Sequence, residues 1–345
     1  MVWKILLALL FFSFMIFAHE FGHFITARLF GVGVNEFSIG MGPKILSKRS
    51  QKSGTLYAIR LFPIGGFVSL VGEDEKSDEE NALNNKPWYQ RFVILFAGSG
   101  MNIITAVLAM FIILASSPYY ASCVVADSDN FPLQESVIYE AGILDGDKIV
   151  EINGEKMNVY QDISYKIMLE GKNPVDITVV RNGERITFDD VQFPTDEQDG
   201  IVFGLPDFSI YAMKKTFPTL IRETFYESFS TVKVIYSSLV GLLTGEYGIE
   251  AMSGPVGTVN AIAESAEMGV RSLATLFVFI SMNLGVFNLL PFPALDGGRL
   301  VFVIIEAIRR KPIKPEHEGY VHLAGMVLLL LLMVFITFKD ILKLI

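Results

Sequence analysis

Long apolar stretches alternate with polar ones along this chain, and four of the apolar stretches are long enough to cross a bilayer. The first, second and fourth stretches cover about residues 2–30, 92–115 and 321–338. The third begins near residue 273, is interrupted at 291–296 and resumes at 300–308. A membrane-spanning helix needs about 20 mainly apolar residues. We therefore predict a polytopic α-helical membrane protein with about four transmembrane helices.

The basic residues between these spans predict the orientation of the chain. The first connection carries seven Lys and Arg residues between Lys44 and Lys86, and the last carries four between Arg309 and Lys314. Loops rich in Lys and Arg stay on the cytoplasmic side of a membrane. We therefore expect both connections to be cytoplasmic, and both termini and the long central segment to lie outside.

Residues 213–245 combine a helical spacing of apolar positions with several charges. Arg222, Glu223, Glu227 and Lys233 fall among the apolar residues. A helix of this kind lies on a membrane surface or packs against other helices. A fifth span is the alternative, but it would reverse the third span and break the agreement of the basic loops.

The central segment, about 119–205, is polar and contains two strand–turn–strand patterns. Asn-Gly dipeptides at 153–154 and 182–183 stand between segments that alternate like strands. Such dipeptides favour tight hairpin turns. Residues 160–170 have the pattern of a short helix, so we predict a small inserted α+β domain.

This arrangement resembles a PDZ domain of the kind found in bacterial envelope proteases, and the match is best over 141–155. Such domains can bind a peptide end by adding it as a strand to an exposed sheet edge. Peptide capture, a passive size filter over the membrane site and a spacer without a binding role remain alternatives.

A second β-forming pattern lies in the first connection. Residues 56–62 and 67–71 are apolar segments that flank Pro63-Ile-Gly-Gly66. This pattern predicts a β-hairpin. We expect it to be associated with the membrane, and an ordinary hairpin at the cytoplasmic surface is the alternative.

Composition and charge narrow the class of protein. Hydrophobic residues make up 51% of the chain and the mean hydropathy is +0.45, which is too apolar for a soluble protein of 345 residues. The net charge of −9 argues against nucleic acid as a partner. The one cysteine, Cys123, excludes an intrachain disulfide and a zinc–thiolate cluster, and the first apolar run lacks a small-residue cleavage site of a signal peptide.

The first predicted span contains the sequence His19-Glu20-Phe-Gly-His23. On a helix, two histidines four residues apart lie on one face, so both imidazoles can reach one metal ion. Glu20 can then act as general base on metal-bound water. Ionisable groups inside a membrane are costly and indicate a function. The pattern predicts a metal-dependent hydrolase that works within the lipid bilayer.

A catalytic zinc site usually has three protein ligands, and the histidines supply two. His317 and His322 lie at the start of the last span, whereas Asp296 follows two prolines and precedes two glycines that must interrupt a membrane helix. Irregular backbone at membrane depth occurs only where it is buried or lines a wet cavity. Asp296 is therefore the stronger candidate for the third ligand.

Taken together, His-Glu-x-x-His, a PDZ-like insert and Asn-x-x-Pro-x-Pro-x-Leu-Asp-Gly resemble the site-2 protease family, in particular its bacterial regulator-of-sigma-E type with one PDZ-like domain. The resemblance implies that His19, His23 and Asp296 bind Zn²⁺ and that Glu20 is the catalytic base. It also implies substrate-binding roles, which we assign to Asn102, Asn288, Gly65, Gly66 and Phe67.

The resemblance further implies an intramembrane zinc endopeptidase of the bacterial cytoplasmic (inner) membrane. Its substrates would be single-span membrane proteins, including anti-sigma factors and remnant signal peptides, already trimmed outside by a site-1-type protease. A quality-control protease of broader range would share the same site. The alternative of another class is a PDZ-bearing scaffold or a metal-binding pseudoprotease, but metal binding alone does not require Glu20.

Four regions follow from these patterns. We expect spans one and two with the hairpin in 1–118, the PDZ-like extracytoplasmic domain in 119–206, the amphipathic helix and a connector in 207–270, and spans three and four in 271–345.

Overall fold

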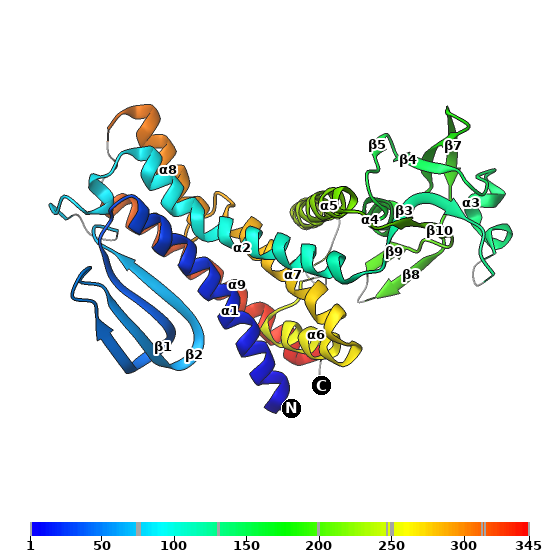
Figure 1. The fold of residues 1–345 in the computed structure, drawn as a ribbon. Coiled ribbons are helices and arrows are strands. Elements are labelled where there is room, and N and C mark those ends of the chain that lie inside the picture. Colours follow the sequence, from blue (N-terminus) through cyan, green and yellow to red (C-terminus); the bar gives the residue numbers. More distant parts are fainter. Residues whose placement is uncertain are drawn as a thin grey trace. The chain divides into compact units, whose positions relative to one another are not determined.

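The computed structural model describes residues 2–73, 77–129, 132–198, 201–245, 248, 252–311, 313 and 315–343. The chain divides into two compact units, and each is described by itself. The first combines Met1–Ala109 with Ser253–Ile345, and the second is Met110–Met252. Figure 1 shows that long helices dominate the first unit and that most strands belong to the second.

Four helices in the described part of the chain are long and apolar enough to cross a membrane, as the sequence predicts. They are α1 (Val2–Leu29), α2 (Trp88–Ser116), α7 (Val270–Asn288) and α9 (Pro315–Lys343). A helix satisfies its backbone hydrogen bonds internally, which the hydrocarbon of a bilayer requires. The chain is therefore a multi-pass membrane protein.

The third predicted span is interrupted where its prolines and glycines indicate. α7 ends at Asn288, and α8 (Asp296–Arg309) begins after a non-helical segment. The sequence did not predict α6 (Pro255–Met268), which packs against α1 and α7. Met15 and Ile262 are fully buried in the apolar core that these helices share.

The strand pairing of the first unit corrects the predicted hairpin. β1 (Val34–Arg49) pairs with β2 (Leu56–Leu70), and Ser38 of β1 has two partners, Phe67 and Ala58. A strand residue has one neighbour on each side, so both halves of β2 lie beside β1 instead of pairing with each other. Apolar periodicity identifies strand-forming segments but not their partners, and β1 was not predicted as a strand.

The second unit is built around a sheet with the strand order β10–β3–β4–β6–β7, in which β5 also pairs with β4, and β8 pairs with β9 separately. The strands are β3 (Tyr119–Ala126), β4 (Lys148–Ile152), β5 (Glu155–Lys156), β6 (Val175–Arg181), β7 (Glu184–Val191), β8 (Thr195–Gln198), β9 (Ile201–Gly204) and β10 (Ser209–Lys214). The short helices of the chain are η1 (Leu83–Asn85), η2 (Leu133–Glu135) and α3 (Val137–Glu140).

Both predicted hairpin turns of this unit are confirmed. Asn153 and Gly154 have φ values of 49° and 75°, and Asn182 and Gly183 have values of 54° and 88°. Two successive residues with positive φ are what a type I′ turn requires. The predicted short helix is α4 (Tyr160–Glu170), and its inward side chains complete an apolar core with the sheet.

The predicted amphipathic helix is α5 (Phe217–Thr244), and it is not among the four candidate spans. Its N-terminus is capped by Thr216, and Gly245 ends it in the left-handed conformation. Lys233 Nζ lies 3.0 Å from Glu155 Oε1, so α5 is tied to the sheet domain by an ion pair within the second unit.

Candidate metal centre

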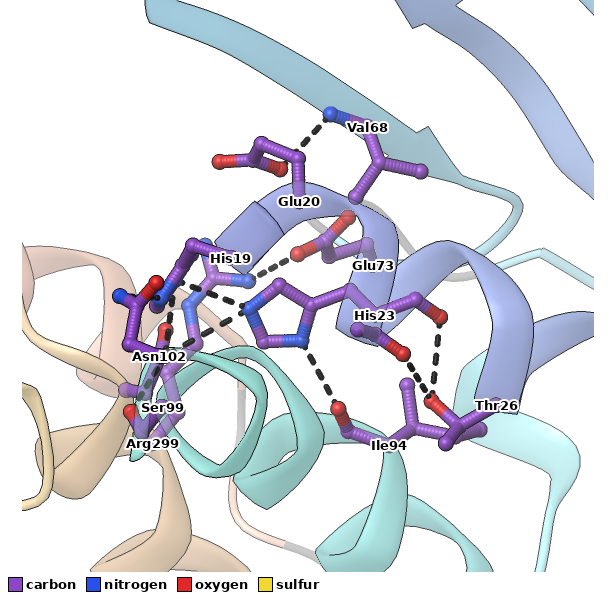
Figure 2. A network of polar contacts seen from close by, with 12 residues as sticks. His19, Glu20, His23, Thr26, Val68, Glu73, Ile94, Ser99, Asn102 and Arg299 are labelled. Atoms are coloured by element: carbon purple, nitrogen blue, oxygen red, sulfur yellow. Dashed lines mark hydrogen bonds and ion pairs between the residues drawn. The ribbon is translucent and has the colours of Figure 1, made fainter. Parts of the chain in front are cut away.

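The two histidines of the first span lie side by side on α1. Because α1 is a continuous helix through His19 and His23, the imidazoles are one turn apart, and their Nε2 atoms are 3.2 Å from each other. Figure 2 shows both rings directed toward the same point beside α2.

Asp296 joins the histidines from the first residue of α8. Its Oδ2 atom lies 3.2 Å from Nε2 of His19 and 3.5 Å from Nε2 of His23. The side chains are 12%, 10% and 20% exposed for His19, His23 and Asp296, respectively. Three donor atoms far apart in sequence therefore converge in a largely buried place.

The spacing of these atoms suits a zinc ion. At the usual zinc–ligand distances, ligand atoms of a tetrahedral site lie roughly 3.3–3.5 Å apart. The observed separations of 3.2, 3.2 and 3.5 Å agree with that edge length. Two imidazoles and one carboxylate are also a donor set that catalytic zinc takes, with a further position open.

The backbone turns sharply just before Asp296, and this turn requires the small residues found there. Ala294 has a φ of 77°, and its N–H donates to Nδ1 of His322 at 2.9 Å. A β-carbon at Gly297 would overlap the carbonyl of Leu290. The two glycines therefore let the chain turn back on itself just where α8 presents Asp296, and His322 supports the turn.

Helix α2 comes unusually close to the two histidines. A β-carbon at Gly98 would overlap Nε2 of His23 and lie 2.8 Å from Nε2 of His19. On the facing helix, a β-carbon at Gly22 would overlap the carbonyl of Ala97. Glycine at both positions permits this approach, because no other residue leaves the space free.

Each of the three candidate ligands also contacts α2. Nδ1 of His23 donates to the carbonyl of Ile94 at 2.8 Å, and Oγ of Ser99 donates to Oδ2 of Asp296 at 3.2 Å. The side-chain amide of Asn102 lies 3.2 Å from Nδ1 of His19 (Figure 2). The sequence singled out Asn102 but not Ser99 or Ile94, since a backbone carbonyl gives no signal in a sequence.

Glu20 points away from the histidines toward β2, as Figure 2 shows. Its Oε2 atom accepts a hydrogen bond from the N–H of Val68 at 2.9 Å. Glu20 thus lies between the candidate metal ligands and the edge of a strand.

The predicted substrate-binding residues are placed differently from one another. Gly65, with a φ of 76°, and Gly66 are buried in β2 just before Val68, and the ring of Phe67 lies under the Arg60 guanidinium at 4.9 Å. Asn288 ends α7 with a partly exposed side chain. Asn102 is instead fully buried against His19.

An ion pair that the sequence did not predict ties β2 to α8. Glu73 Oε1 lies 2.5 Å from Nη1 of Arg299, and Glu73 Oε2 accepts from the N–H of Leu70 at 3.1 Å. Arg299 is three residues after Asp296, on the first turn of α8. The pair therefore connects the strand beside Glu20 to the helix that carries Asp296 (Figure 2).

Four candidate spans, a cluster of two histidines and an aspartate that could hold a metal ion, and a glutamate next to the first histidine are the features expected of a membrane metalloprotease. The family described as Peptidase family M50 matches residues 7–332, and the chain belongs to that family.

Relatives match almost the whole chain. The protein CPE1693 of Clostridium perfringens is 38% identical over 98% of each chain. The zinc metalloprotease RasP of Shouchella clausii and the regulator of sigma-W protease RasP of Bacillus subtilis are each 30% identical, over 96% of this chain and 97% of theirs. The predicted family, protease class and zinc dependence are confirmed, and the chain is an intramembrane zinc metalloprotease.

Proposed function

We propose that this chain cuts peptide bonds within the membrane at a zinc site made by His19, His23 and Asp296, with Glu20 as the catalytic base. The observation that carries the proposal is the convergence of three donor atoms at 3.2–3.5 Å beside Glu20. A zinc ion held there would polarise the scissile carbonyl and make water acidic enough to ionise near neutral pH. Glu20 takes the proton of the attacking water and passes it to the leaving amine.

The hydrogen bond from Val68 supports this role for Glu20. It fixes one carboxylate oxygen at 2.9 Å, so the carboxylate is held in one orientation at the edge of β2. A base that is already oriented needs less rearrangement in the transition state than a freely rotating side chain. The other carboxylate oxygen then carries the proton.

We further propose that an extended substrate segment lies along β2 at Gly65, Gly66 and Phe67. A transmembrane helix hides its carbonyls in internal hydrogen bonds, and a segment unwound for cleavage needs new partners. Phe67 is paired with β1 on one side, while the N–H of Val68 faces Glu20 on the other. A strand added at this edge would pass directly over the catalytic base, and the partly exposed Asn288 would hold another part of it.

The proposed substrates are single-span membrane proteins, including anti-sigma factors and remnant signal peptides, after an earlier cut by a site-1-type protease. Support comes from the relative that is named a regulator of sigma-W protease. We place the enzyme in the bacterial cytoplasmic membrane, with the PDZ-like domain on the outer side. Along the chain, this domain (119–206) follows the region 1–118 and precedes the regions 207–270 and 271–345. That domain would capture a peptide end at a sheet edge or limit the size of substrates.

The decisive variant is Glu20→Gln, studied in the full chain with Glu264→Gln, an exposed glutamate of α6, as control. We expect Glu20→Gln to keep one zinc per chain and to lose cleavage of a model transmembrane substrate by about 10²–10⁴-fold. The control should match the wild type in both measurements. Cleavage that survives in Glu20→Gln would remove it as the base, and a zinc-bound wild type without cleavage would favour the pseudoprotease alternative.

A further inference from the structure

We propose that one face of α2 positions all three metal ligands, and that Asn102 is the positioning residue that makes Nε2 of His19 available to the metal. The inference rests on the proposed zinc site and concerns the atoms behind it. Ile94, Ser99 and Asn102 contact His23, Asp296 and His19, respectively. Their spacing of five and three residues brings them to one side of a helix.

The contact at His23 shows how such a residue works. A backbone carbonyl can only accept a hydrogen bond, so the 2.8 Å contact between His23 Nδ1 and Ile94 O places the proton of this imidazole on Nδ1. The lone pair of a neutral imidazole then lies on Nε2, which is the atom that faces Asp296. A histidine that binds a metal through one nitrogen is usually held through the other in this way.

His19 needs an equivalent acceptor, and Asn102 is the residue in place to supply it. Nε2 of His19 is the atom that faces His23 and Asp296, so Nδ1 must carry the proton when the site is loaded. Nδ2 of Asn102 lies 3.2 Å from Nδ1, and the buried Oδ1 of the same amide has no hydrogen-bond partner among the described residues, so turning the amide over would place this oxygen against His19. An amide can present either its oxygen or its NH₂ group. Only the oxygen can accept from Nδ1–H, and the metal-binding state therefore requires Oδ1 of Asn102 to face His19.

The third contact holds the carboxylate. Ser99 donates to the same oxygen of Asp296 that faces both imidazoles, at 3.2 Å. Gly98 lets the α2 backbone approach closely enough for all these bonds to form. Helix α7 in turn holds α2 in position along its axis, because Ser281 Oγ of α7 donates to the carbonyl of Asn102 at 2.9 Å.

Two substitutions separate an acceptor from a structural role. Asn102→Leu keeps the approximate size but removes the acceptor, and Asn102→Asp keeps an acceptor and loses the NH₂ donor. Ile104→Val, two residues further along α2, is the control, since the Ile104 side chain is exposed. The full chain in detergent is titrated with zinc against a chelator, and the absorption bands of the cobalt-substituted protein report the ligand set.

We expect Asn102→Leu to weaken zinc binding by about 10–100-fold and to alter the cobalt bands. Asn102→Asp should stay within a few-fold of the wild type and keep its spectrum, as should Ile104→Val. Zinc affinity and spectrum unchanged in Asn102→Leu would overturn the positioning role while leaving the zinc site intact. Asn102→Asp as weak as Asn102→Leu would also overturn it, because the amide would then act as a donor or a packing group. A wild type that binds no zinc would overturn the proposed site together with this inference.

Discussion

Asp147 in the second unit and Asp296 in the first have opposite kinds of partner. In the second unit, Asp147 is 1% exposed, accepts from Nε and Nη2 of Arg181 at 2.8 and 2.6 Å, and also accepts from the N–H of Leu144. In the first unit, Asp296 faces Nε2 of His19 and of His23. Asp147 thus has a permanently charged partner in the chain, whereas the partners of Asp296 are groups that themselves bind metals.

The difference separates a stabilising cluster from a binding one. A buried carboxylate is costly unless it is paired and hydrogen-bonded. The guanidinium meets that requirement for Asp147 without any ligand. In the first unit, the carboxylate of Asp296 and the imidazoles of His19 and His23 place their acceptor atoms 3.2–3.5 Å apart. A cation bound to all three groups would compensate best for the burial of this carboxylate. Changes in the first unit should therefore affect zinc before stability, and changes at Asp147 should do the reverse.

The largest effect is expected from Gly98→Ala. The added methyl group would occupy the space next to Nε2 of both histidines, so they could not converge on one ion. We expect loss of stoichiometric zinc and of cleavage, measured by metal analysis and a model transmembrane substrate. Gly100→Ala on the same helix is the matched control, because a β-carbon there would meet only the Phe96 ring at 3.2 Å. Full zinc occupancy in Gly98→Ala would contradict the close approach of α2.

Asp147→Asn should change the second unit and leave the first alone. Asparagine keeps the shape but loses the charge that faces Arg181 and part of the hydrogen bonding. We expect the free energy of opening of β4 and β6 to fall by about 1–3 kcal/mol, measured by hydrogen exchange in the full chain, with zinc content unchanged. Asp189→Asn, an exposed position on β7, is the control. Loss of zinc in Asp147→Asn would remove the proposed separation of roles.

The same pair predicts an acid-dependent loss of stability. Burial opposes ionisation of Asp147, but the hydrogen bonds and charge of Arg181 outweigh it, so the pKa of this carboxyl lies below its usual value. The unfolded chain has a pKa of about 4 for aspartate, so the stabilisation is complete above that pH and is lost as the pH falls through the lower pKa of the folded state. The difference between the wild type and Asp147→Asn in the exchange of β4 and β6 should therefore shrink below about pH 4. A constant difference would exclude the ionised form as its source.

The features that the sequence predicted are the local ones. The turns at Asn153 and Asn182 depend on two adjacent residues, and α4 covers residues 160–170 as predicted, because its signal lies within one short window. Asp296 was found because prolines and glycines around it have few other uses inside a span. Contacts between distant segments gave no comparable signal.

Three examples show what sequence patterns lack. The two-sided pairing of Ser38 depends on which segments of the chain meet, and apolar spacing does not encode that. The ion pair between Glu73 and Arg299 joins residues more than 200 positions apart. Asn102 was predicted to bind substrate, and its contact with His19 depends on the rotation of α2 about its axis. Each of these is a tertiary property that local sequence patterns do not determine.

The smallest effect is expected at the Glu73–Arg299 pair, which belongs to the first unit but binds no metal in the proposal. Glu73 accepts from the end of β2 and pairs with the first turn of α8, so it fixes the strand edge relative to Asp296. Both side chains are partly exposed, at 20% and 32%, which limits the strength of the pair. Glu73→Gln should therefore lower kcat/KM by roughly fivefold, which corresponds to about 1 kcal/mol.

Zinc content should stay at the wild-type value in Glu73→Gln, because no donor atom is removed. Glu80→Gln, an exposed position in the same connection, should change neither quantity. A charge reversal sharpens the test: Glu73→Arg with Arg299→Glu should recover part of the activity that either change alone loses, if the pair acts through its charge. If Glu73→Gln instead lost zinc, the assembly of the metal ligands would depend on the position of β2. The metal site and the substrate-binding strand of the first unit would then not be separable.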